Sequence, residues 1–121
     1  MIKHCNGGGQ VAGTARVANT AFVGPNASVI GNAAVSGNAI ISGHAVIAGC
    51  ARVTDNAVVS GFAIVSDRAL VQDYATVSGF ARVGGKATIK DNAQVVENAL
   101  VLGSWVICKS AYVTGQYIEE N

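Results

Sequence analysis

Apolar and polar positions recur along this chain with a strict period of six residues. Seventeen consecutive hexapeptides run from Gly13 to Thr114; the third position is Ala in sixteen of them, with Trp105 as the exception, and the fifth is Val or Ile in all. On an extended segment, positions three and five point to one side and position four points to the other. The pattern therefore predicts short strands with Ala and Val or Ile facing a core and position four facing solvent.

The residues between these strands are typical of tight corners. Gly, Asn and Asp dominate the first two positions, as in Gly31–Ser36 and Asp55–Ser60, and these residues tolerate the positive φ that sharp corners need. Units this short cannot bury an apolar face alone and must stack. Three sides close a triangle of 18 residues per coil, so we expect an all-β triangular prism of about six coils, on the order of 27 Å long.

The hexapeptide, [small]-x-[Val/Ile]-x-x-x, resembles the repeat of the left-handed parallel β-helix (hexapeptide-repeat) family. The resemblance covers residues 13–114. It implies a single-stranded left-handed parallel β-helix, whereas general crossover statistics favour right-handed connections. The monotonous Gly/Asp-Asn-Ala-x-Val-Ser units are similar to those of uncharacterised bacterial and prophage repeat proteins.

Both ends of the chain depart from the repeat. We divide the chain into an N-terminal segment with a degenerate first repeat (1–12), the β-helix (13–114) and a C-terminal cap (115–121). Residues 1–6 either fray or cover the first coil. Trp105 and Tyr117 share the inward phase near the end of the solenoid, so we expect them to cap it; ligand stacking on Trp105 is the alternative.

Composition narrows the classes of function and the compartment. The net charge is +1 and 12% of residues are charged, so no strong field favours nucleic acid or an anionic membrane. No apolar run approaches the ~20 residues that span a bilayer, and the N-terminus lacks the apolar core of a secretory signal. The three cysteines, Cys5, Cys50 and Cys108, have no paired spacing. We expect a cytoplasmic protein, or a phage particle assembled in the cytoplasm.

The resemblance makes acyl transfer the first enzymatic hypothesis. It implies a trimer, acetyl-CoA as cofactor and a histidine base between neighbouring subunits, for which His44 is the candidate. The unbroken repeat, however, leaves no place for the loop that often covers acyl-CoA. The segment 102–108 also fails to match the family's Gly-x-x-x-Trp-[Ile/Val]-Gly turn. The alternative is an exposed corner histidine, and we expect no cofactor.

Residues 18 positions apart should lie above one another on the prism. One edge then carries apolar side chains in both outward and corner positions, with His44 heading the corner column. The set comprises Phe22, Ile40, Val46, Val58, Phe62, Ile64 and Phe80. An exposed strip of this kind indicates a protein interface, and the family's usual solution is a homotrimer. The alternative is that β-branched residues simply suit outward strand positions.

A column of aspartates and a cluster of basic residues are further candidates. Asp55, Asp73 and Asp91, with Lys109 next in line, would either bind a cation or accept amides of their own turns. Arg52, Arg68 and Lys86 would either meet phosphate or an acidic sugar, or form a solvated corner. No aromatic residues alternate with these cations, which argues against a nucleic-acid platform.

The sequence therefore predicts a non-enzymatic structural or interaction protein, a rigid β-helical scaffold of phage or prophage origin. One alternative is a hexapeptide-repeat acyltransferase that acts at a subunit interface. The other is a carbohydrate-binding module that uses the corner aromatics Phe62, Phe80 and Tyr74.

Overall fold

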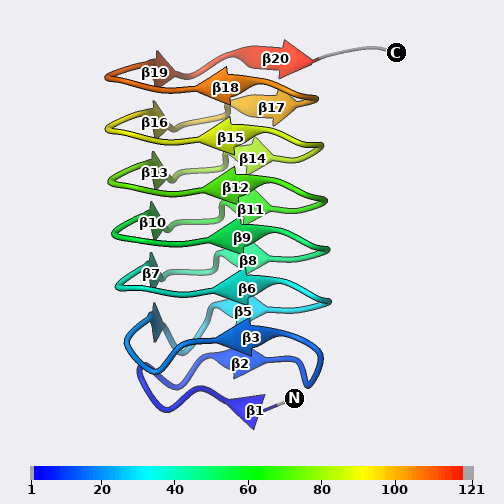
Figure 1. Cartoon of the computed structure of the whole chain (residues 1–121), viewed down its shortest axis with the longest axis vertical. Coiled ribbons are helices and arrows are strands. Elements are labelled where there is room, and N and C mark those ends of the chain that lie inside the picture. The colour runs from blue at the N-terminus through cyan, green and yellow to red at the C-terminus, as the bar shows by residue number, and fades with distance from the viewer. Residues whose placement is uncertain (1, 119–121) are drawn as a thin grey trace.

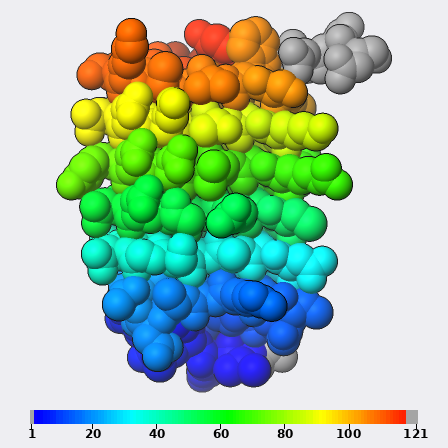
Figure 2. Space-filling model, viewed as in Figure 1, coloured from blue at the N-terminus to red at the C-terminus, as the bar shows by residue number. Residues whose placement is uncertain are grey.

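The computed structural model, which describes residues 2–118, is a left-handed parallel β-helix. The described residues contain strands and turns and no helix, and the chain makes about six turns of about 18 residues each. Successive coils lie on one another as layers, from β1 at the N-terminal end to β20 at the other (Figures 1 and 2). The predicted fold class is confirmed.

Three sheets form the three sides of the prism, and the strands of each sheet come from every third hexapeptide. Sheet A contains β1 (Ile2–Lys3), β2 (Gln10–Val11), β5 (Ser28–Val29), β8 (Val46–Ile47), β11 (Ile64–Val65), β14 (Arg82–Val83), β17 (Leu100–Leu102) and β20 (Gln116–Ile118). Sheet B contains β3 (Arg16–Val17), β6 (Ala34–Val35), β9 (Arg52–Val53), β12 (Leu70–Val71), β15 (Thr88–Ile89) and β18 (Val106–Ile107). Sheet C contains β4 (Phe22–Val23), β7 (Ile40–Ile41), β10 (Val58–Val59), β13 (Thr76–Val77), β16 (Gln94–Val95) and β19 (Tyr112–Val113).

Within the repeats, neighbouring strands pair in parallel at the register that the 18-residue coil requires. Val58, for example, pairs with Ile40 on one side and with Thr76 on the other. The exception is β1, which pairs antiparallel with β2. Residues 18 positions apart in the repeats are therefore neighbours on the surface.

The core consists of the third and fifth positions of the repeat. From Ala21 to Val101, the Ala and the Val or Ile at these positions are 0–1% exposed, and Ile41, Ile47 and Ile89 are the largest fully buried side chains. A prism with sides only two strand residues wide leaves space for one branched side chain at mid-side and a methyl group near each corner. The narrow cross-section thus explains why Ala is kept so strictly.

From Asn32 to Asn92, each corner is tied to the corner of the next coil by a backbone hydrogen bond. The N–H of His44 donates to the carbonyl oxygen of Gly61, and the N–H of Phe62 donates to that of Gly79, both at 2.7 Å. Gly61 has a φ of +67°, and a Cβ added there would lie 2.9 Å from the backbone N and O of Gly79. The corner therefore needs both positive φ and a close backbone approach, which Gly meets without strain.

The N-terminal segment covers the first coil rather than fraying from it. The N–H of Gly9 donates to the carbonyl oxygen of Val23 at 2.9 Å, and the N–H of Val23 donates to that of Asn6 at 3.0 Å. The imidazole Nε2 of His4 lies 2.9 Å from the carbonyl oxygen of Ala21. Of the two sequence-based alternatives for residues 1–6, the structure has the covering one for residues 2–6, while Met1 lies outside the described residues.

Candidate functional site

The apolar edge lies where sheet C meets sheet A, and we call this the C–A corner. On sheet C the outward side chains of Phe22, Ile40 and Val58 are direct register neighbours. On sheet A, Val46 pairs with Ile64, and Ile64 pairs in turn with Arg82, where the apolar run on that face ends. The structure thus brings the seven predicted interface residues onto two adjoining faces and the corner between them.

An aromatic column stands on the C–A corner itself. The rings of His44 and Phe62 stack with centroids 4.9 Å apart and an interplanar angle of 9°, and Phe62 and Phe80 stack at 5.2 Å and 3°. The corner hydrogen bonds hold the three backbones one coil apart, so the rings stack at nearly the strand spacing. Phe62 is 53% exposed and Phe80 is 62% exposed. The column therefore projects apolar ring edges into solvent.

His44 lies in this column without the orientation that a general base needs. A catalytic imidazole is normally held by a hydrogen bond to a second polar group. Among the described residues, no side chain or backbone group forms such a hydrogen bond with the His44 side chain. Its ring stacks on the ring of Phe62 instead. Within one chain, the arrangement is that of an exposed ring in an aromatic stack.

The three corner aromatics considered for glycan binding do not form one platform. Tyr74 lies between β12 and β13, at the corner between sheets B and C, which we call the B–C corner; Phe62 and Phe80 lie at the C–A corner. The stack also covers both faces of Phe62. Stacking on a sugar requires a free ring face, so the central ring of the column is closed to it.

The aspartate column at the B–C corner is a ladder of hydrogen bonds between the corners of successive coils. Oδ2 of Asp55 accepts the N–H of Asp73 at 3.2 Å, Oδ2 of Asp73 accepts that of Asp91 at 3.0 Å, and Oδ2 of Asp91 accepts that of Lys109 at 2.9 Å. The expected bonds within the same turn are thus replaced by bonds to the next coil. Among residues 2–118, no group of three or more His, Cys, Asp or Glu side chains is arranged to hold a metal ion.

We predict that Asp73→Ala destabilises the fold by about 1–2 kcal/mol, because it removes the acceptor of a part-buried amide. Part of this loss arises because Asp73 has a φ of +61°, in the left-handed region that Asp tolerates better than Ala. Asp73→Gly loses the same hydrogen bond but tolerates that φ, and should fall between Ala and the parent. Urea denaturation of the three proteins tests this order. Equal stability of the Ala and Gly variants would contradict this order. A rise in parental Tm with Ca²⁺ would contradict the assignment of the aspartate column to hydrogen bonds alone.

The basic candidates lie on sheet B and at its corner with sheet A, the A–B corner. Arg52 points outward from β9, and Arg68 and Lys86 occupy successive coils of the A–B corner. Their backbones follow the general corner pattern, since the N–H of Arg68 donates to Gly85 O at 2.8 Å and that of Lys86 to Gly103 O at 3.0 Å. All three side chains are exposed, so a phosphate or acidic-sugar site at this position stays a prediction.

At the C-terminal end, Trp105 and Tyr117 contact each other. Their rings meet edge to face with centroids 5.3 Å apart. Trp105 is 37% exposed and Tyr117 is 39% exposed, so both rings stay partly in contact with solvent. Their assignment as a cap stays a prediction.

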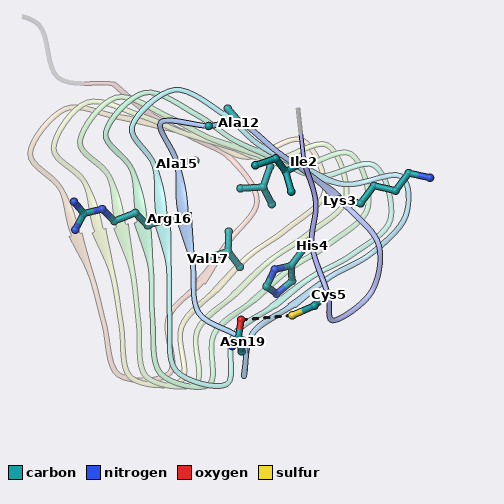
Figure 3. Close-up of a pocket in the computed structure, with 11 residues that line it drawn as sticks. Ile2, Lys3, His4, Cys5, Ala12, Ala15, Arg16, Val17 and Asn19 are labelled. Atoms are coloured by element: carbon teal, nitrogen blue, oxygen red, sulfur yellow. Dashed lines mark hydrogen bonds between the residues drawn. The ribbon is translucent and has the colours of Figure 1, made fainter.

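The N-terminal end has a pocket that the repeat pattern did not indicate. Its volume is about 470 Å³, and it lies between the segment that contains His4 and the strand β3 (Figure 3). Figure 3 shows the imidazole of His4 inside the outline of the prism, while Arg16 points away from it on the outer face of β3. Cys5 Sγ donates to Asn19 Oδ1 at 3.5 Å at one edge of the pocket. His4 is 9% exposed, although a histidine outside the repeats carries no burial signal in the sequence.

Comparisons of the chain with protein-family models, with curated proteins and with solved structures give no match. The described residues contain no helix long and apolar enough to cross a membrane.

Proposed function

We propose that this chain is a non-enzymatic scaffold that assembles into a homotrimer through the apolar edge at the C–A corner. The observation that carries the proposal is the exposed stack of His44, Phe62 and Phe80. Outward strand residues have a local explanation in β-propensity, but corner phenylalanines do not. Because apolar side chains flank the stack on both sides, three such corners that meet around a threefold axis would remove one contiguous strip from water.

A solenoid suits this role because its side chains stand on a stiff frame. The corner hydrogen bonds recur from coil to coil, as between Phe80 N–H and the carbonyl oxygen of Glu97 at 2.7 Å. Little backbone order is lost when a preformed surface binds, which favours association at a given buried area. We propose a phage or prophage assembly in the cytoplasm as the setting, on the resemblance of the repeat.

The trimer is tested by the solution mass of the parent and of Phe62→Asp/Phe80→Asp. We expect the parent to have three times the 12.2 kDa chain mass and the double variant to be a monomer, because six buried carboxylates would face one axis. Tyr74→Asp is the matched control, since Tyr74 is a corner aromatic with 66% exposure outside the edge. A monomeric parent, or a trimer that survives the double substitution, would show that the edge is not the interface.

Thermal stability separates this scaffold from an acyl-CoA-dependent enzyme. A cofactor that binds the folded state raises Tm by mass action. We expect saturating acetyl-CoA to leave the Tm of the parent unchanged. A concentration-dependent rise would favour the transferase, and His44 would then be the first residue to replace.

A further inference from the structure

The hydrogen bonds between coils follow one repeating pattern along the solenoid. At the N-terminal end the N–H of Arg16 donates to Ala33 O at 3.0 Å, and near the other end the N–H of Gln94 donates to Ala111 O at 2.8 Å. Strand N–H groups at the outward position thus donate toward the C-terminal side. Carbonyl oxygens at the inward positions face the N-terminal side, where they accept N–H groups of the preceding coil.

Among residues 2–118 no coil precedes the first one, and the N-terminal segment takes that place on two of the three faces. On sheet A, β1 pairs with β2. On sheet C, the edge groups of β4 are satisfied: Ala21 O contacts His4 Nε2 at 2.9 Å, Val23 O accepts Gly9 N–H at 2.9 Å, and Val23 N–H donates to Asn6 O at 3.0 Å. Residues 4–9 therefore reproduce the contacts of a preceding strand.

Sheet B lacks this cover. Its strand β3 is the last strand of the sheet and pairs only with β6 among the described residues. The equivalent edge groups, six residues earlier, are Ala15 O, Val17 O and Val17 N–H, and residues 2–118 supply no hydrogen-bond partner to any of them. Two acceptors and one donor, spaced as in every other coil, are left at an open edge.

The pocket of about 470 Å³ lies along this open edge. Apolar side chains of Ile2, Val11 and Val17 line it, and the segments on sheets A and C bound it on either side. The pocket therefore lies over the inward side chain of Val17, at the position where the fifth-position Val or Ile of a preceding coil would lie. On the outer side, exposed Arg16 is the register neighbour of any strand added to β3.

We propose that this slot binds an extended segment of a partner polypeptide, which adds a strand to β3. The segment would donate two N–H groups to Ala15 O and Val17 O, accept Val17 N–H, and place one aliphatic side chain in the pocket. Arg16 favours an acidic residue at the outward position opposite it, because opposite charges on neighbouring strands stabilise the pair. Sheet B is the face opposite the C–A corner, so this site does not depend on the proposed trimer.

The test uses the peptide Gly-Asn-Ala-Glu-Val-Ser, which is the unit Gly31–Ser36 with Ala34→Glu, and the matched peptide with Lys in place of Glu. We expect saturable binding of the Glu peptide at millimolar concentration, several-fold tighter than the Lys peptide, with slowed exchange of the Val17 amide proton by NMR. In Arg16→Glu, an exposed substitution, the order of the two peptides should reverse. A Glu peptide N-methylated at the amides that face β3 should lose binding.

Several results would overturn the proposal. These are no binding of the Glu peptide by the folded parent, an unchanged exchange rate of the Val17 amide at saturation, or an unchanged peptide order in Arg16→Glu. Protection of the Val17 amide that rises with protein concentration in the absence of peptide would assign the slot to a second copy instead. The solution mass of Phe62→Asp/Phe80→Asp reports only on the trimer, so the failure of one proposal leaves the other standing.

Discussion

Ile89→Ala is expected to destabilise the fold by about 2–5 kcal/mol. Ile89 lies on β15, next to the end strand β18 of sheet B, is 0% exposed and is among the largest buried side chains. Its register neighbours are Val71 on β12, which is paired on both sides, and Ile107 on β18, which is the last strand of sheet B. Because β12 and β15 are hydrogen-bonded on both sides, their backbones have little freedom to close the cavity, and we expect the loss to fall within this range.

The matched control is Thr88→Ala on the same strand. Thr88 points outward and is half-buried, so its loss should cost about 1 kcal/mol or less. Urea denaturation of both variants and the parent measures the difference, and sheet B keeps the comparison away from the proposed trimer edge. Similar losses for the two variants would mean that the inward and outward assignment of the strand is wrong.

Gly9→Ala is expected to detach the N-terminal segment from the first coil and to destabilise the fold by about 1–3 kcal/mol. A Cβ on Gly9 would lie 2.3 Å from Val23 Cγ1 and 2.5 Å from the carbonyl oxygen of Gly24. Neither neighbour can retreat, because Val23 is a core residue and the N–H of Gly24 is bonded to Ile41 O at 2.8 Å. The segment must move instead, which exposes the core end now covered by His4.

Gly13→Ala provides the control, since a Cβ on Gly13 would meet nothing within 4 Å. Hydrogen exchange should show faster exchange at the Gly9 and Val23 amides in Gly9→Ala and parental rates in Gly13→Ala. Parental protection of the Val23 amide in Gly9→Ala would show that the segment is not held by this close contact.

The sequence predicted the coil because one six-residue repeat corresponds to one side of the prism with its corner. Ala at position three and Val or Ile at position five have one inward phase, and the 18-residue spacing correctly placed Phe62 between His44 and Phe80. Columns follow from arithmetic once the coil length is known. The handedness came only from the resemblance to a family, since the repeat itself is compatible with either hand.

The fold of the N-terminal segment and the hydrogen-bond partners of the aspartates could not be predicted from the repeat, for physical reasons. The contact of His4 with Ala21 depends on how a non-repeating segment folds back, and no period reports on that. Asp73 was recognisable as a corner residue, but the choice of a partner in the next coil depends on its side-chain rotamer and on the distance between coils. Sequence alone therefore located the corner and missed the direction of its hydrogen bond.

The division of each coil into three equal sides has a consequence for insertions and deletions. Adding one hexapeptide between His44 and Phe62 would turn everything beyond it by a third of a revolution, so these two rings would no longer share a corner. Adding 18 residues would instead lengthen the molecule by ~4.8 Å and keep every face in phase. The number of whole coils thus sets the length of the molecule, while the number of single sides between two features determines whether they lie on the same face.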